Sequence, residues 1–132
     1  MKREPLIHLI QGSLRRMDQK RALTFLRGRE IETRLSFHDL DEDSDCMARS
    51  FKRMGLGQGD CAVLFLPKCV SWVVAHLAVL KIGAISVPLN PAFTKRELAY
   101  FLKETTPKLA MVGVNQVEAV REIAPSLPLV TV

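Results

Sequence analysis

The chain has 132 residues, of which 48% are hydrophobic and 25% are charged. This composition supports a packed core and excludes an intrinsically disordered protein, and the length fits one domain or one subdomain. The formal net charge at pH 7 is +5. The excess lies in residues 1–34, which hold nine Lys/Arg and four Asp/Glu, whereas residues 35–132 hold ten of each sign.

The basic first segment favours either a solvated surface or attraction for a polyanion such as ATP, CoA or nucleic acid. Nothing in it interleaves aromatic with basic side chains, so nucleic acid is the least favoured partner and we expect none. The longest uncharged apolar stretch, Cys69 to Leu80, has twelve residues, whereas a membrane-spanning helix needs about 20. We therefore expect a soluble protein with no membrane span.

Three cysteines, Cys46, Cys61 and Cys69, form no Cys-x-x-Cys pair and have no histidine at zinc-ligand spacing. No signal peptide opens the chain. We therefore expect a cytoplasmic protein whose thiols stay reduced and serve as small apolar residues.

The first 35 residues predict a helix followed by a β-hairpin. Apolar residues recur at helical spacing from Pro5 to Met17, and Pro5 suits the first turn of a helix. Strands over Ala22–Arg27 and Ile31–Leu35 are expected to pair around a turn at Gly28.

A long amphipathic helix is predicted from Phe37 to Met54, with Ser36 as an N-cap residue that accepts a hydrogen bond from the Asp39 N–H. Its buried stripe is expected at Leu40, Ser44, Met47, Phe51 and Met54. Acidic residues crowd its first half and basic residues its end, which complements the helix dipole. The acidic run could alternatively hold a metal, but a solvated helix start explains it more simply.

Beyond this helix, buried strands and helices alternate. Strands are expected at Cys61–Leu66, Ile85–Leu89, Leu109–Val112 and Leu129–Val132. Helices are expected at Cys69–Ile82, Thr94–Glu104 and Asn115–Ala124, the last capped by Asn115. The first of these helices is apolar almost all round and should be buried on most sides. This order implies parallel βαβ units with right-handed crossovers, and hence an α/β fold.

Several residues have both a structural and a functional interpretation. His76 lies in an apolar helix and is better explained as a packed core residue than as a general base. Trp72 is better explained as core filling than as a stacking platform. Asn90 and Thr94 could present backbone N–H groups to an anion, but capping suits them better, because Thr94-x-x-Glu97 has the form of a capping box.

A series of motifs runs through the middle of the chain. In order, they are Ser36-Phe37-His38-Asp39-Leu40, Gly55-Leu56-Gly57-Gln58-Gly59-Asp60, Val63-Leu64-Phe65-Leu66-Pro67, Ala75 to Ala84, Val87-Pro88-Leu89-Asn90-Pro91, Phe93-Thr94 and Glu97 to Leu102. Over about 80 of the 132 residues, this series resembles the early part of AMP-forming acyl-CoA synthetases. Their relatives include luciferases and the adenylation domains of peptide synthetases.

The resemblance implies the N-terminal portion of the acyl-CoA synthetase-like large domain, with residues 1–132 as a single incomplete domain. Residues 1–35 would form the helix and hairpin, and residues 36–132 the α/β units. It further implies an acid–thiol ligase that converts a carboxylic acid, ATP and CoA to acyl-CoA, AMP and pyrophosphate. ATP, Mg²⁺ and CoA would be the cofactors and partners of the parent enzyme.

The catalytic motifs of that family have no match in this sequence. They are a Gly-rich phosphate loop that ends in Pro-Lys-Gly, an aromatic-Gly-x-Thr-Glu motif, a ribose-binding Asp and a Lys near the C-terminus. The turn Gly55–Gly59 is no substitute, because it follows a helix and lacks a following Lys and Ser/Thr. We therefore assign no catalytic, cofactor-binding or metal residue, and expect the isolated chain to be inactive and to bind no cofactor.

Two other interpretations stay open. One is a non-catalytic, stand-alone binding or interaction module derived from the ligase fold. The other is an unrelated flavodoxin-like or Rossmann-like nucleotide binder, which the lack of a Gly-x-Gly-x-x-Gly motif after Cys61–Leu66 disfavours. Under the ligase interpretation the strands and the helix Cys69–Ile82 would normally be covered by later parts of the large domain. Alone they would leave an apolar face exposed, so we expect self-association or a swapped arrangement.

Overall fold

The computed structural model describes residues 5–132, so the first four residues of the basic segment lie outside the described part of the chain. In chain order the elements are α1 (Leu6–Arg16), β1 (Arg21–Arg27), β2 (Glu30–Ser36), α2 (Phe37–Arg53), β3 (Cys61–Phe65), α3 (Val70–Ile82), β4 (Ile85–Pro88), α4 (Lys95–Thr105), β5 (Leu109–Val112), the 3₁₀ turn η1 (Val114–Gln116), α5 (Val117–Ile123) and β6 (Leu129–Thr131). Each predicted helix and strand is present, with ends displaced by at most two residues.

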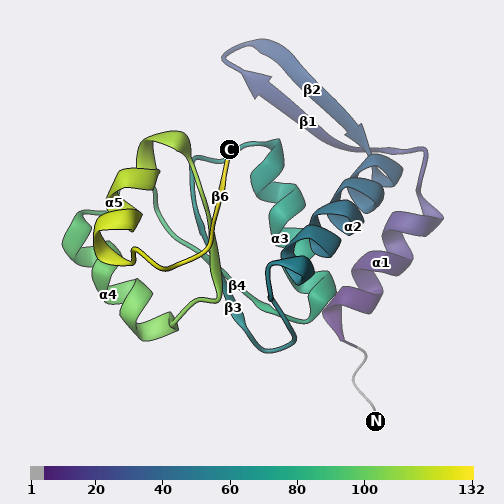
Figure 1. Ribbon diagram of the computed structural model, residues 1–132. Coiled ribbons are helices and arrows are strands. Elements are labelled where there is room, and N and C mark those ends of the chain that lie inside the picture. The colour runs from purple at the N-terminus through teal and green to yellow at the C-terminus, as the bar shows by residue number, and fades with distance from the viewer. Residues whose placement is uncertain (1–4) are drawn as a thin grey trace.

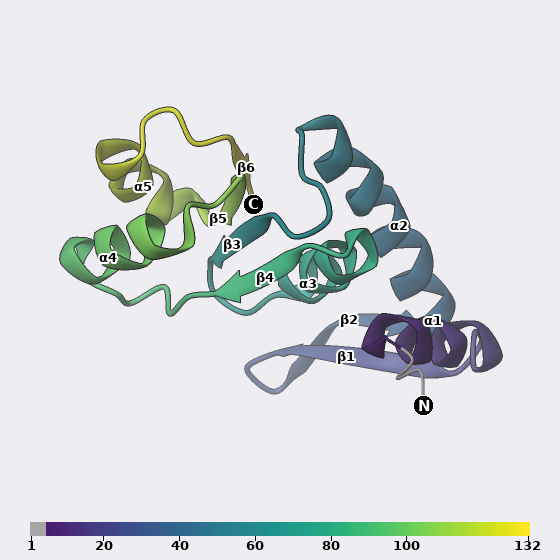
Figure 2. The same ribbon diagram turned by 90° about the horizontal axis from the view of Figure 1, so that it is seen from below.

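The main sheet has the strand order β4-β3-β5-β6, and all of its pairings are parallel. Helices α2 and α3 cover one face and α4 and α5 cover the other, which makes a three-layer α/β arrangement (Figure 1). This confirms the predicted fold class. Strands β1 and β2 form a separate antiparallel hairpin, which projects from the amino-terminal end of α2, away from the main sheet (Figure 1 and Figure 2).

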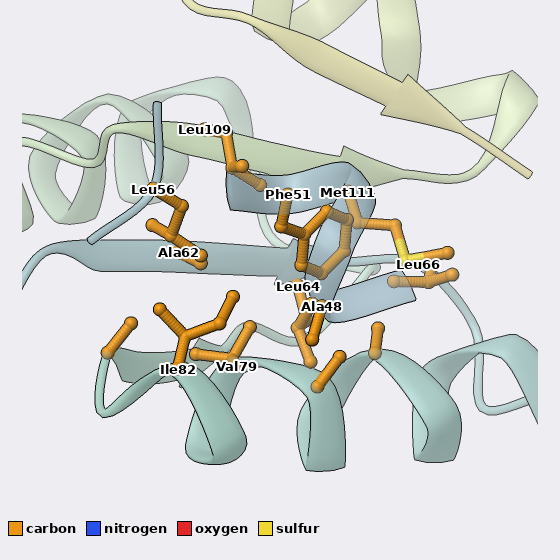
Figure 3. Packing of buried hydrophobic residues seen from close by; sticks show 13 residues of the cluster. Ala48, Phe51, Leu56, Ala62, Leu64, Leu66, Val79, Ile82, Leu109 and Met111 are labelled. Carbon is orange, nitrogen blue, oxygen red and sulfur yellow. The ribbon is translucent and has the colours of Figure 1, made fainter. Parts of the chain in front are cut away.

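Strand β3 supplies side chains to both faces of the sheet. Ala62 and Leu64 pack against α2 and α3 (Figure 3), whereas Val63 and Phe65 pack against α4 and α5. All four are at most 2% exposed. The predicted burial of this strand on both faces is therefore confirmed, and the alternation follows from the period of two in a β-strand.

Helix α2 begins and ends with local hydrogen-bonded motifs. At its start, Ser36 and Asp39 form a full capping box, which adds a reciprocal bond to the predicted cap. Hydrogen bonds donated by the backbone and then the hydroxyl of Ser36 lower the pKa of Asp39. At its end, the N–H of Leu56 donates to the carbonyl of Phe51, and Gly55 has φ 95°. This is a Schellman motif, and it brings Leu56 and Phe51 into one core cluster.

Two predicted side-chain positions differ from the structure. The sequence pattern places Met54 in the buried stripe of α2, but its side chain is 36% exposed and Ala48 is buried instead. The reason is that α2 ends at Arg53, where the chain turns away. Asn115 is predicted to cap the following helix, but it lies inside η1, and α5 begins without a side-chain cap.

Helix α3 is covered more completely than its sequence suggests. None of its residues is classed as exposed, because α2 lies across it and α1 packs at its outer side, where Leu14, Leu40 and Val74 form a cluster. Val73, Leu77 and Leu80 stay partly exposed, so the apolar face expected on this helix is smaller than predicted. No helix within residues 5–132 is long and apolar enough to cross a membrane.

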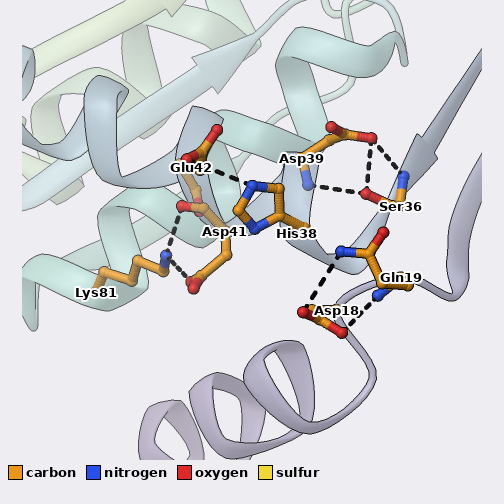
Figure 4. Close-up of polar contacts among 9 residues, drawn as sticks. Asp18, Gln19, Ser36, His38, Asp39, Asp41, Glu42 and Lys81 are labelled. Atoms are coloured by element: carbon orange, nitrogen blue, oxygen red, sulfur yellow. Dashed lines mark hydrogen bonds and ion pairs between the residues drawn. The ribbon is translucent and has the colours of Figure 1, made fainter.

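A buried lysine joins α2 to α3 (Figure 4). The side chain of Lys81 is 4% exposed, and its ammonium group lies 2.6 Å from the Asp41 carboxylate and 2.7 Å from that of Asp45. It also donates to the backbone carbonyl of Asp41 over 3.0 Å. All three donors of the ammonium group are thus satisfied, which is the condition under which a buried charge is tolerated.

Replacing Lys81 with Met should destabilise the fold, because two carboxylates would then face an apolar group. We expect the free energy of unfolding in urea to fall by roughly 2–4 kcal/mol, somewhat less than for a fully buried pair, since Asp45 is half exposed. Lys95→Met is the matched control, because Lys95 pairs with Glu122 on an exposed surface and its loss should have little effect. Equal effects of the two substitutions would contradict this role of Lys81.

Candidate functional site

The winding of the main sheet changes direction between β3 and β5. The chain leaves β3 toward α3 on one face and leaves β5 toward η1 and α5 on the other. In open parallel sheets, ligands bind outside the carboxyl ends of the strands near such a switch point. The candidate site is therefore the edge formed by the segments that follow β3, β4 and β5 (Figure 1).

Between β3 and β5, this edge is closed by direct contact. A Cβ atom on Gly113 would lie 2.4 Å from Oε1 of Gln116 and 3.3 Å from Cδ of Pro67. The N–H of Gly113 donates to the carbonyl of Phe65 over 3.2 Å. The segments after β3 and β5 thus lie against each other at Gly113, so this crevice leaves little room for a ligand.

Between β3 and β4, by contrast, the same edge is hollowed. A hollow of about 500 Å³ is lined by residues 66–68 after β3, residues 88–91 at the end of β4, and Trp72 in the first turn of α3. Its lining is mainly apolar, and Lys68 is the one charged residue in it. No carboxylate within residues 5–132 forms an ion pair with Lys68. We call this the β3–β4 hollow.

The indole ring of Trp72 is supported from the side of α3. Its ring stacks on the imidazole of His76, with centroids 5.4 Å apart and planes inclined by 11°. Nδ1 of His76 lies 2.8 Å from the hydroxyl of Ser86 in β4. Burial lowers the pKa of His76 below its ordinary value of 6.5. At neutral pH the ring is therefore uncharged, and one hydrogen bond from a strand sets its orientation.

The other predicted candidates have structural roles. Thr94 and Glu97 form the expected capping box, and hydrogen bonds donated by Thr94 lower the pKa of Glu97. Asn90 does not cap this helix; its side-chain oxygen accepts from the N–H of Ala92 over 3.0 Å, which closes a turn. The turn Gly55–Gly59 lies at the amino end of β3, opposite the hollow.

The acidic run of α2 is engaged in protein contacts. Asp39 binds the helix start at Ser36, Asp41 and Asp45 bind Lys81, and Glu42 lies 3.4 Å from His38 (Figure 4). Within residues 5–132, no three side chains of His, Cys, Asp or Glu are grouped so that they could hold a metal ion.

Lys68 and Ser86 are the two site residues that sequence reasoning missed. Lys68 follows a strand and Pro67, a position that could have been recognised as the carboxyl edge of the sheet. Ser86 belongs to a four-residue strand, and its contact with His76 depends on how α3 packs on β4. No pattern in the sequence reports that contact. The structure also shows that His76 is only partly buried, so core packing is an incomplete description of it.

Titration of His76 should be visible in the fluorescence of Trp72, the single tryptophan of the chain. A protonated imidazole quenches a stacked indole, so emission should fall as the pH drops, with a midpoint below 6.5 because burial lowers the pKa. Between the lowered pKa of His76 in the folded state and about 6.5, the unfolded state binds more protons than the folded state does. The free energy of unfolding should therefore also fall as the pH drops below about 6.5. His76→Gln should abolish both changes, and a transition that survives this substitution would contradict the assignment.

The comparisons with known proteins agree with this architecture. The family model described as AMP-binding enzyme matches residues 10–132. The chain is 32% identical over 113 residues to a probable CoA ligase of Humulus lupulus. The matched segment covers 83% of this chain and 22% of that protein. It is 32% identical over 96 residues to a long-chain-fatty-acid–CoA ligase of Bacillus subtilis, which covers 73% of this chain and 16% of that protein.

Among solved structures, an anthranilate CoA ligase in complex with anthranoyl-AMP has the same fold, with a TM-score of 0.86 and 20% identity. The match covers 98% of this chain and 25% of that protein. The chain thus spans about a fifth of the length of the curated relatives it matches. Since the family match takes in almost all of the sequence, the chain belongs to the family of AMP-binding enzymes, the adenylate-forming ligases that include the acyl-CoA synthetases.

Proposed function

We propose that the chain is part of an ATP-dependent acid–thiol ligase, and that it forms the first layers of the large domain. The observation that carries the proposal is the family match over residues 10–132. The reaction would join a carboxylic acid to CoA through an acyl-adenylate, with release of AMP and pyrophosphate. The CoA ligases among the curated relatives support this reaction class.

The chemistry of the proposed reaction needs a clamp for a triphosphate and positive groups at the developing charge. Residues 5–132 do not fit these needs. On α2, Asp39 is held by Ser36 and both Asp41 and Asp45 are held by Lys81, which argues against a Mg²⁺ site built from these three carboxylates. We therefore infer that the 132 residues supply scaffold to a ligase, and that the isolated chain neither forms adenylates nor binds Mg²⁺–ATP productively.

The sharpest test compares this chain with a longer one. The reading frame that follows Val132 in the gene should encode a Gly-rich phosphate loop. The longer protein should then catalyse ATP–pyrophosphate exchange that depends on a carboxylic acid, because adenylate formation is reversible. The 132-residue chain is the control and should show no exchange above the enzyme-free background. A stop codon after Val132 would instead favour a non-catalytic module, and exchange by the short chain would overturn its inferred inactivity.

We also infer that the isolated chain self-associates, as expected of a part removed from a larger domain. A groove of about 490 Å³ between α2, α3 and β6 supports this inference, since it is lined mainly by apolar side chains such as Met47, Phe51, Val74 and Val130. Strand β6 lies at the sheet edge and, within residues 5–132, pairs only with β5, which leaves a row of backbone groups for a further strand. Separately, we infer a cytoplasmic location from the three free cysteines, because thiols stay reduced in the cytosol.

A measurement of the oligomeric state tests this inference directly. Light scattering of the 132-residue chain should give a mass above the 14.8 kDa of one copy, and the mass should rise with concentration. Val130→Lys places a charge in the groove at the edge strand and should shift the protein toward the monomer. Glu104→Gln, which raises the net charge by the same one unit on the exposed surface of α4, is the control. A monomer at all concentrations would refute self-association.

A further inference from the structure

We propose that the first part of the chain forms a surface that docks on an anionic lipid bilayer without crossing it. This surface consists of the exposed side chains of residues 5–34, which come from α1 and from the hairpin of β1 and β2. We call it the α1–hairpin surface. Figure 2 shows α1 and the hairpin along one edge of the molecule, with α4 and α5 at the opposite edge. The inference goes beyond the proposed ligase reaction, because it concerns where the protein resides and not what it converts.

The positive charge of the molecule is concentrated on this surface. Residues 5–34 hold seven Lys/Arg and three Asp/Glu, whereas residues 35–132 hold ten of each sign. All seven basic side chains are exposed; they are Arg15, Arg16, Lys20, Arg21, Arg27, Arg29 and Arg34. Within residues 5–132, Arg27 is the only one of the seven that forms an ion pair, with Glu32. Such an uneven distribution orients a protein toward a negatively charged surface.

Large apolar side chains are exposed at two points of the same surface. At the start of α1, Leu6 is 66% exposed and Leu9 is 54% exposed. Next to the turn of the hairpin, Leu26 and Ile31 are paired across the two strands, and they are 53% and 47% exposed. Exposed aliphatic side chains together with basic ones are typical of elements that lie in the interface of a membrane.

The helix and the hairpin are held to the body of the protein by one apolar cluster. Leu14 of α1 packs with Leu40 and Val74, and Ala22 and Leu35 at the base of the hairpin pack against the same cluster. The strands of the hairpin are paired from this base to the turn. The α1–hairpin surface is thus formed before it meets a bilayer, so docking loses less conformational entropy than the ordering of a flexible segment would.

Two other kinds of partner fit this surface less well. Nucleic acid is bound by basic side chains interleaved with aromatic ones, and no Phe, Tyr or Trp within residues 5–34 is exposed. The core of a protein–protein interface is depleted in charged residues, whereas here Arg27 and Arg29 follow Leu26 at the turn. A bilayer accommodates both kinds of side chain, because aliphatic groups enter its acyl region while arginines reach the headgroups.

Vesicle binding by the 132-residue chain tests the proposal. Flotation assays compare vesicles of phosphatidylcholine with vesicles that contain equal amounts of phosphatidylcholine and phosphatidylglycerol. The protein should bind the anionic vesicles about tenfold more tightly than the neutral ones, and added salt should weaken this binding. No binding to the anionic vesicles, or equal binding to both compositions, would overturn the proposal.

A first pair of substitutions tests the apolar contribution. Leu26→Ser combined with Ile31→Ser should weaken binding to the anionic vesicles about tenfold, because two aliphatic side chains no longer enter the bilayer. Val114→Ser combined with Ile85→Ser is the matched control, since these side chains are exposed on other elements, and it should not change the affinity. Circular dichroism checks the folding of each variant. Unchanged binding by the Leu26 and Ile31 variant would show attraction to any polyanion, and it would overturn the assignment to a bilayer.

A second pair tests the position of the charge. Arg29→Gln combined with Arg34→Gln should weaken binding to the anionic vesicles about tenfold. Arg96→Gln combined with Lys103→Gln removes the same charge from the exposed surface of α4 and should have little effect. Equal losses in the two variants would mean that net charge alone sets the affinity. That result would overturn the α1–hairpin surface as the docking site, whether or not the longer protein is a ligase.

Discussion

Burial of residues 62–65 of strand β3 on both faces of the sheet is the constraint on which the rest of the structure depends. Its backbone pairs with β4 on one side and β5 on the other, while Leu64 and Phe65 enter the cores on opposite faces. Since burial of large apolar side chains is the main favourable term in folding, the four helices are positioned by what this strand presents to them. The strand ends at Phe65, and Pro67 follows it, which cannot donate a hydrogen bond to a continued strand. Residues 66–68 thus reach the carboxyl edge, where the β3–β4 hollow forms.

The helices on the α2–α3 side are held by two different kinds of interaction. The Schellman motif at Gly55 is local, since it depends on a residue that tolerates a positive φ angle. The ion pairs of Lys81 with Asp41 and Asp45 join residues 36 to 40 positions apart in the chain. A buried charge network of this kind fixes one packing arrangement at least as much as it adds stability, because only one register of α2 against α3 satisfies every donor. The placement of α3 in turn sets the position of Trp72 and His76.

The family assignment is consistent with the chemistry of the described residues. The chain belongs to the adenylate-forming ligases, yet its described residues offer a neutral imidazole, an indole and an ammonium group in place of a phosphate clamp. Phosphoryl chemistry needs several positive groups or a metal ion at the developing charge, and a single exposed lysine does not make such a clamp. The described residues therefore fit a scaffold, with the β3–β4 hollow at the carboxyl edge of its sheet.

The sequence by itself determined the element order, the α/β class, the Ser36 N-cap and the Thr94–Glu97 capping box, because these depend on short-range spacing. Examples are the apolar run after Cys61 and the Thr94-x-x-Glu97 pattern. It also determined the family, through motifs that follow one another at fixed spacing. Only the tertiary structure decided that Lys81 is buried between two carboxylates, that His76 meets Ser86, and that Lys68 shares a hollow with Trp72. Each of these contacts joins separate elements, so each depends on the packing of helices on the sheet, a long-range property that local patterns do not report.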